Sequence, residues 1–313
     1  MNNFLPWGLS AWLPKDCERL RRYESVLRNL FIAAGAGEIA TPAFEYAETL
    51  ENGFGNPEKF FRFFDTDGNV LALRPELTTP AARLFATALN KLPRPVKVFY
   101  LGQVFRQEEI HSGRFREFRQ AGFECYGGNS PDADVAIIKL AIEALKQLNC
   151  NDCILEIGHV GIVKDILSEC GIHGSKRKDI MQCVEKKDRA TLEELSSPQI
   201  IKELLMLPRD ENFFPSAKDL LKGKTALNPL LNLEKIYERV SVLSDEFKIF
   251  LEPAATRRID YYTGIVFEGL LEKMPRPVLS GGRYDTLVGQ FGESVPATGF
   301  SIELEALLRL SEV

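Results

Sequence analysis

The sequence predicts an α+β domain that is interrupted along the chain by a helical insertion. Three observations lead to this prediction. Amphipathic patterns of helical period run over 14–34 and 131–148. Two strand-like runs, 96–106 and 115–126, are joined by a polar loop and predict neighbouring strands. After about residue 170 the pattern becomes short, charged and helical, and strand-like runs return only near residue 249.

The N-terminal segment predicts a helix followed by a short extended piece. Pro14 suits the first turn of a helix, because its missing N–H would have no partner there. Gly35 is placed to end that helix. Residues 38–41 then read as extended chain stopped by Pro42. The apolar face of the predicted helix consists of Leu20, Tyr23, Leu27, Leu30 and Ala34.

The next segment predicts a hairpin and a second helix. Residues 60–73 contain two apolar runs around Asp67-Gly68, a pair that favours a tight turn between antiparallel strands. A helix is expected over 78–90. Thr78 or Thr79 is the expected N-cap, because a hydroxyl can accept a backbone N–H that lacks a partner at the helix start.

The C-terminal half predicts the insertion and the return of the core. Prolines break the helical pattern at Pro198, Pro208, Pro215 and Pro229. Strand-like pattern returns at 249–251 and 263–267, and a short helix is expected over 303–310. We therefore expect three parts: a first core part over 1–170, a helical insertion over 171–247 and a last core part over 248–313.

Composition limits the classes of function. The net charge is −5 and the pI about 5.5, which argues weakly against a protein whose main task is to grip a phosphate backbone. No apolar stretch reaches the roughly 20 residues that span a bilayer. Residues 1–12 lack the basic and apolar regions of a secretory signal. We expect a cytoplasmic protein without a membrane segment.

The cysteines predict no metal site. Six are scattered along the chain, and in a reducing compartment we expect thiols. Cys150 and Cys153 have C-x-x-C spacing, which is compatible with a metal or redox pair. However, no second pair accompanies them, and His159 and His173 lack ligand spacing to each other. We expect neither a metal nor a cofactor.

One face of the predicted strand pair is polar. Side chains alternate along a strand, so the even-numbered residues of both strands share a surface. That surface carries Arg106, Gln120 and Glu124 together with two glycines. These side chains could surround a small zwitterion, the guanidinium facing a carboxylate and Glu124 facing an ammonium. The spacing is equally compatible with an ion-pair network on an open sheet. The odd-numbered residues, such as Phe123, could form the packed face.

The loop between these strands carries a resemblance to a known family. Over 106–120 it reads R-Q-E-E-I-H-S-G-R-F-R-E-F-R-Q. This is very similar to motif 2 of class II aminoacyl-tRNA synthetases, in the form of the histidyl branch. Further segments resemble that family: R-P-E-L-T at 74–78, E-I-A-T-P-A-F-E (motif 1) at 38–45, R-R-I-D-Y-Y-T-G (the histidine signature) at 257–264 and S-G-G-R-Y-D at 280–285.

The resemblance implies a fold and a ligand. The family has a mixed, mainly antiparallel sheet flanked by helices and a dimer interface built on motif 1. Its histidine-contacting positions fall here on Glu76, Thr78, Arg106, Gln120, Glu124, Arg257, Tyr261 and Tyr262. By this resemblance the glutamates would hold the α-ammonium and an imidazole nitrogen. The arginines would hold the carboxylate, and a tyrosine would form an amphipathic wall.

The sequence also departs from the synthetase pattern. Ala306 stands where motif 3 has an arginine that neutralises nucleotide phosphates, and Glu303 stands where a glycine is expected. Ala11 replaces an aspartate and Ile110 a proline. The sequence ends at Val313, and we expect the protein to lack the anticodon-binding domain of the synthetases. Together these departures imply a core that binds the amino acid but handles ATP and tRNA poorly.

A group of histidyl-synthetase paralogues fits this pattern: the regulatory subunits of ATP phosphoribosyltransferase. Residues 96–105 and 296–301 resemble that group more than true synthetases. The resemblance implies a non-catalytic regulatory subunit in histidine biosynthesis, with histidine as effector and no tRNA. It would form a homodimer within a hetero-oligomer with the short-form catalytic subunit. Two alternatives are a truncated, histidyl-tRNA synthetase-like amino-acid-activating enzyme and a stand-alone histidine sensor.

Overall fold

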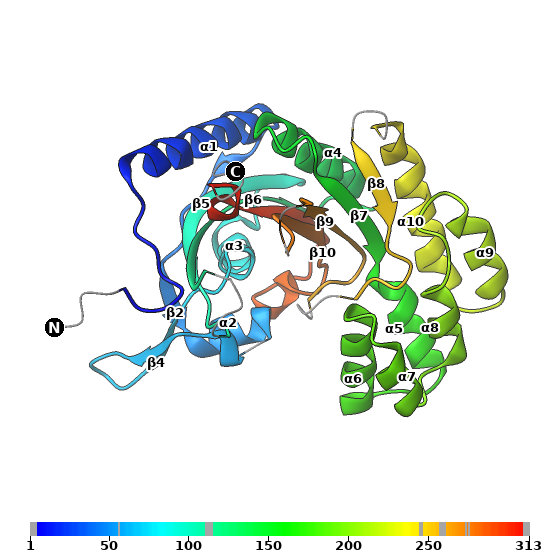
Figure 1. The fold of residues 1–313 in the computed structure, drawn as a ribbon. Coiled ribbons are helices and arrows are strands. Elements are labelled where there is room, and N and C mark those ends of the chain that lie inside the picture. Colours follow the sequence, from blue (N-terminus) through cyan, green and yellow to red (C-terminus); the bar gives the residue numbers. More distant parts are fainter. Residues whose placement is uncertain are drawn as a thin grey trace. The chain divides into compact units, whose positions relative to one another are not determined.

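The structure is a computed structural model that describes residues 5–55, 57–109, 115–243, 247–256, 261–272, 274 and 276–308. The chain divides into two compact units. Figure 1 labels the helices and strands from which they are built. The first unit comprises Met1–Gly128, Glu143–Cys150 and Asp285–Val313, and the second comprises Asn129–Ile142 and Asn151–Tyr284. The predicted insertion, 171–247, lies wholly inside the second unit. Its boundaries as a separate domain stay a prediction.

The predicted strand pair is the centre of the first unit. β5 (Val96–Phe105) and β6 (Glu117–Tyr126) are antiparallel, with Tyr100 opposite Gly122. This register places even-numbered residues opposite even-numbered ones, as the alternation predicts. The strand order is β1-β5-β6-β11, with β1 (Gly37–Glu38) parallel to β5 and β11 (Ala297–Glu303) antiparallel to β6. The predicted pair of neighbouring strands is therefore confirmed, and the structure shows that the two strands are antiparallel.

A small second sheet of the first unit contains the predicted hairpin. β3 (Arg62–Phe64) and β4 (Val70–Leu73) are antiparallel, and β2 (Phe44–Tyr46) pairs with the other edge of β4. Gly68 has a φ of +84°, the left-handed conformation that glycine adopts without strain. The carboxylate of Asp65 accepts hydrogen bonds from the backbone N–H groups of Asp67 and Asn69 and so organises the turn.

Helix α1 (Pro14–Ala33) packs on the odd face of the strand pair (Figure 1). Phe31 is fully buried, and its ring lies 5.6 Å from that of Phe99 and 5.5 Å from that of Phe123. Truncating a buried phenylalanine to alanine typically costs about 3–5 kcal/mol of folding free energy, so this contact anchors the helix. The odd face is therefore the packed face, as the sequence predicts.

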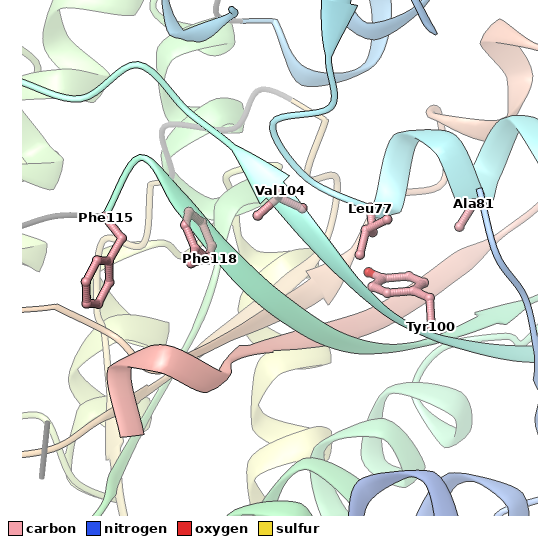
Figure 2. Close-up of a cluster of buried hydrophobic side chains, with 6 residues drawn as sticks. All are labelled: Leu77, Ala81, Tyr100, Val104, Phe115 and Phe118. Atoms are coloured by element: carbon pink, nitrogen blue, oxygen red, sulfur yellow. The ribbon is translucent and has the colours of Figure 1, made fainter. Parts of the chain in front are cut away.

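The even face is covered in part by α3 (Thr78–Leu84), which continues as a π-helical turn over Phe85–Leu89. Figure 2 shows the buried cluster there, in which Leu77 lies beside Tyr100. The cluster consists of Leu77, Ala81, Tyr100, Val104, Phe115 and Phe118. The other helical segments of the unit are α2 (Ala47–Phe54), the short turns Pro57–Lys59 and Val288–Gln290, and α11 (Leu304–Leu308). The start of α3 thus lies against the face that carries the predicted polar residues.

In the residues that the structure describes, the second unit consists of four strands and a set of short helices. The strand order is β10-β9-β7-β8, with β7 parallel to β8 and the other neighbours antiparallel. The strands are β7 (Ile154–His159), β8 (Lys248–Leu251), β9 (Ile265–Leu270) and β10 (Leu279–Arg283). The helices are α5 (Val160–Glu169), α6 (Gly174–Glu185), α7 (Arg189–Glu194), α8 (Gln199–Leu204), α9 (Phe213–Leu220) and α10 (Leu227–Val240), followed by a 3-10 turn over Ser241–Leu243. The range of the predicted insertion holds the helices α6 to α10.

The division between the units falls inside α4 (Asp132–Gln147). Near its start, the carboxylate of Asp134 forms a buried ion pair with the guanidinium of Arg283, at 2.8 Å from Nη2. Both side chains are almost completely buried, and the arginine side chain packs on Gly264. Removing either partner of such a pair would leave a buried charge uncompensated and would strongly destabilise the fold. The S-G-G-R-Y-D segment therefore contributes a structural arginine to the second unit.

Of the helices that the structure describes, none is long and apolar enough to cross a membrane. The six cysteines all lie within the described ranges and form no disulfide. Over the same ranges, no group of three or more His, Cys, Asp or Glu side chains is arranged to hold a metal ion.

Candidate functional site

The start of α3 is capped by a glutamate. Glu76 Oε2 accepts a hydrogen bond from the backbone N–H of Thr78 at 2.5 Å, and Oε1 accepts from that of Thr79 at 2.8 Å. The prediction that Thr78 or Thr79 is the N-cap is therefore wrong, because both threonines already lie within the helix. A carboxylate here also faces the positive end of the helix dipole. Burial raises the pKa of Glu76, and these hydrogen bonds oppose the rise.

Tyr100 connects α3 to the sheet. Its hydroxyl donates a 2.8 Å hydrogen bond to Glu124 Oε1 and lies 3.2 Å from Thr78 Oγ1. All three side chains are buried. Burial and the neighbouring carboxylate of Glu124 raise the pKa of Tyr100 well above its usual value, so the phenol stays protonated and can donate. The result is a fixed position for Glu124.

Two glycines make room for this arrangement. A Cβ atom at Gly122 would lie 2.4 Å from the ring of Tyr100, and one at Gly299 would approach the carboxylate of Glu124 closer still. Both contacts are shorter than real Cβ atoms allow. Gly122 and Gly299 therefore each mark a close approach to the backbone, and the approaching groups are side chains of the protein itself.

Arg106 lies at the other end of the polar face. Its Nε donates to the carbonyl oxygen of Pro75 at 2.6 Å, and its guanidinium lies 5.1 Å from the ring centre of Phe118 and 5.5 Å from that of Phe54. Stacking on aromatic rings suits the planar guanidinium and holds it in one orientation. Its Nη1 lies 3.9 Å from Oε1 of Glu303, the last residue of β11.

Gln120 lies between the charged residues. It pairs with Gly102 of β5 on one side and with Glu303 of β11 on the other. Its side chain is 4% exposed, and its Oε1 has no hydrogen-bond partner among the residues that the structure describes. Burying an amide oxygen without a hydrogen-bond partner costs on the order of 1–3 kcal/mol of folding free energy. Such an atom is suited to accept a hydrogen bond from a ligand.

Five of the eight predicted site residues therefore lie together on the even face of the first unit: Glu76, Thr78, Arg106, Gln120 and Glu124. The second unit carries Tyr261 and Tyr262, which are both buried and have ring centres 4.9 Å apart. Lys164 donates a 2.6 Å hydrogen bond to the carbonyl oxygen of Tyr262. Arg257 lies outside the described residues.

Sequence reasoning missed two residues of the site. Tyr100 is an even-numbered residue of the first predicted strand to which the sequence alone assigns no role, although its position opposite a glycine in the antiparallel register is a usable signal. Glu303 was noted only as a departure from a pattern, and its contact with Arg106 joins positions almost 200 residues apart. The assembled face can hold a small molecule that carries both a positive and a negative group.

The chain is similar to known proteins along nearly its whole length. The sequence model of the family described as histidyl-tRNA synthetase matches residues 8–307. The chain is 38% identical to an ATP phosphoribosyltransferase regulatory subunit of Moorella thermoacetica, covering 97% of this chain and 81% of that protein. It is 34% identical to a regulatory subunit of the same name from Desulforamulus reducens, covering 96% and 77%.

Solved structures show the same architecture. A crystal structure of an ATP phosphoribosyltransferase regulatory subunit/histidyl-tRNA synthetase from Bacillus halodurans is similar with a TM-score of 0.88 at 29% identity. The match covers 99% of this chain and 83% of that one. A histidyl-tRNA synthetase from Nostoc has a TM-score of 0.81 at 24% identity, covers 99% and 75%, and supports the fold alone. The α+β fold expected of a class II synthetase-like core is therefore confirmed.

Proposed function

Because the chain belongs to the histidyl-tRNA synthetase family and, within it, to the regulatory subunits of ATP phosphoribosyltransferase, we propose that it senses histidine on behalf of a short-form catalytic subunit. As a member of that group, it is a non-catalytic component of ATP phosphoribosyltransferase and acts in histidine biosynthesis. The finer proposal is a cytoplasmic hetero-oligomer in which histidine, bound on the even face, controls the activity of the partner.

The observation that carries the proposal is the polar face itself. Glu124 is held in place by the hydrogen bond from Tyr100, and its carboxylate can accept hydrogen bonds from the ammonium group of an amino acid. Arg106 is held by aromatic rings and can donate to a carboxylate, while Gln120 offers a buried amide oxygen. Charge-assisted hydrogen bonds of this kind are about twice as strong as neutral ones, so the set suits a zwitterion. The family resemblance also assigns Arg257, Tyr261 and Tyr262 to histidine binding, and this assignment stays a prediction.

The end of β11 supports a role without nucleotide chemistry. Ala306, at the position where the synthetases carry an arginine, is fully buried in α11. A methyl group enclosed in the core offers no charge to a phosphate. Without the arginine, the transition state of a reaction at the nucleotide phosphates would lose several kcal/mol of stabilisation, because electrostatic contacts are strongest in a site from which water is excluded.

The small sheet supports the proposed homodimer. Phe44, Tyr46 and Phe63 lie on one face of it, because Tyr46 and Phe63 both pair with Leu71 and Phe44 lies two residues from Tyr46. Each of the three is at least 38% exposed, and the rings of Phe44 and Phe63 are 5.5 Å apart. A contiguous exposed aromatic patch typically marks a protein interface. A two-fold symmetric contact would bury it against the same patch of a second copy.

Regulation requires that histidine bind unequally to two states of the complex. The site residues of the first unit lie on or next to the strands β5 and β6 and at the start of α3. Histidine binding could therefore change the position of α3 relative to these strands. We expect histidine to stabilise one arrangement of the hetero-oligomer. With both components symmetric, the complex should contain equal numbers of the two chains and at least two of this one.

The histidine site can be tested by thermal unfolding. Histidine at 100 times its Kd stabilises a protein by about 2.7 kcal/mol if it binds only the folded state, whereas leucine should give no shift. Glu124→Ala and Arg106→Ala should each remove the histidine shift. Arg28→Ala is the matched control, because it removes an arginine that is paired with Glu38 at the protein surface. If both site variants keep the histidine-induced shift of the parent, the assignment of Glu124 and Arg106 to histidine binding is wrong. The assay should also be carried out on the complex with the catalytic subunit.

The alternative of an amino-acid-activating enzyme is tested by histidine-dependent exchange of pyrophosphate into ATP. We expect none above background at high protein concentration. A turnover within about tenfold of the ~10 per second typical of enzymes would contradict the regulatory assignment.

A further inference from the structure

Glu303 places a built-in carboxylate beside the arginine of the candidate site. It is the last residue of β11, and its Oε1 lies 3.9 Å from Nη1 of Arg106. The Arg106 and Glu303 side chains are 18% and 17% exposed. Water therefore screens this pair less than it would at the surface.

Among the residues that the structure describes, the even face has more carboxylates than cations available to a ligand. Glu76, Glu124 and Glu303 lie there with the guanidinium of Arg106. The guanidinium of Arg116 instead donates to the side chain of Gln107 and to the carbonyl oxygen of Trp7. Arg74 is close by, but its guanidinium donates to the backbone carbonyl groups of Gln103, Thr41 and Pro42. Its hydrogen-bonding capacity is therefore directed to the backbone of the fold.

This balance of charge has a consequence for ligand choice. A ligand carboxylate that approaches Arg106 must share it with Glu303. A zwitterion tolerates this, because its ammonium is attracted by Glu124 and the other carboxylates. A diphosphate or triphosphate brings several negative charges and no positive one, so the same carboxylates repel it.

We propose that Glu303 is the specificity-determining residue that restricts this site to zwitterionic ligands and excludes polyphosphates. The proposal rests on the proposed function, because it concerns the same face that is assigned to histidine. It goes further in assigning the rejection of a ligand class to one side chain. Exclusion of this kind works by repulsion, and removing the repelling group should admit the excluded class.

The test uses the purified chain and two probes, inorganic pyrophosphate and L-histidine, each measured by calorimetric titration. Glu303→Gln keeps the size of the side chain and removes its charge. We expect the affinity for pyrophosphate to rise by about tenfold or more over the parent chain. Glu303→Ala is a second variant with the same expected gain in pyrophosphate affinity, for use if the Glu303→Gln protein folds poorly.

Glu117→Gln is the matched control. It removes the same charge from the neighbouring strand, but residue 117 is odd-numbered and accepts a hydrogen bond from Gln103 on the opposite face. We expect no gain in pyrophosphate affinity. Equal gains in Glu303→Gln and Glu117→Gln would overturn the proposal, because the effect would then follow net charge.

Two further results would also overturn it: a folded Glu303→Gln chain that binds pyrophosphate no better than the parent, and a parent chain that already binds pyrophosphate as tightly as the variant. The histidine titration addresses the proposed function separately. If histidine binds neither chain while pyrophosphate binds only the variant, the histidine assignment fails and the role of Glu303 stands.

Discussion

The hydroxyl of Tyr100 donates a 2.8 Å hydrogen bond to the carboxylate of Glu124 across β5 and β6. The tyrosine ring occupies the space that a side chain at position 122 would fill, and Gly122 leaves that space open. Glu124 thus has its orientation set before any ligand arrives. A preorganised charge binds its ligand with less loss of side-chain entropy than a mobile one.

Tyr100→Phe should weaken histidine binding without unfolding the chain. The substitution keeps the ring but leaves Glu124 without this donor, which should cost about 1–3 kcal/mol of binding or folding free energy. Urea denaturation and the histidine-induced thermal shift measure the two losses. Tyr23→Phe, on α1 at the opposite face, should change neither. Parent-like values for Tyr100→Phe in both assays would show that Glu124 does not depend on this hydrogen bond.

Gly299→Ala should displace the carboxylate of Glu124. The new Cβ would lie within 2.5 Å of the carbonyl oxygen of Phe123 and closer still to the carboxylate, so strand β11 must shift. Overpacking of this kind typically costs 1–3 kcal/mol of folding free energy. Gly37→Ala is the matched control, since its Cβ would meet no atom within 4 Å. Differential scanning calorimetry with and without histidine should show lower stability and a lost histidine response only for Gly299→Ala.

Phe44→Asp should break the proposed homodimer. Phe44 is 49% exposed in the single chain, so a charge there costs the monomer little and would be buried without a partner in a symmetric contact. Light scattering should give about half the parent mass. Val242→Asp changes an apolar residue of the second unit that is 70% exposed and should keep the parent mass. If Phe44→Asp has the same mass as the parent, the aromatic face is not the dimer contact.

Glu305 should make stability fall with rising pH. It is 3% exposed, and burial raises its pKa to about 7, against 4.5 for an ordinary glutamate. The folded state therefore binds the proton more tightly than the unfolded state does. The associated stability is complete below pH 4.5 and is lost as the pH rises to about 7, by roughly 3 kcal/mol. Glu305→Gln should remove this loss, seen in urea denaturation at pH 5 and pH 8. Parallel pH profiles for the parent and the variant would contradict the assignment.

Local sequence patterns predicted much of the fold. Alternation of side chains predicted the β5–β6 pair and its packed odd face, and helical spacing predicted α1 with its buried Leu27. Asp67-Gly68 predicted the hairpin. These features depend on neighbours in the chain, which is why a pattern can indicate them.

The remaining features depend on contacts between distant segments. The cap of α3 is Glu76, because its carboxylate folds back onto the helix start in place of a threonine hydroxyl. The strand β7 was not predicted, since a short apolar run fits a buried helix or strand equally well. The Arg106–Glu303 pair arises only when β11 lies beside β6. No local pattern in the sequence predicts that these two strands lie side by side.

The most direct measurement of the central claim is phosphoribosyl transfer by a purified short-form catalytic subunit, assayed alone and with this chain, with and without histidine. Light scattering on the same mixture gives the mass of the complex. We predict co-elution at equal stoichiometry, higher activity in the mixture, and inhibition by histidine only when this chain is present. Separate elution at micromolar concentrations, with the catalytic subunit equally active and equally inhibited on its own, would contradict the assignment of this chain as its histidine-responsive regulatory subunit.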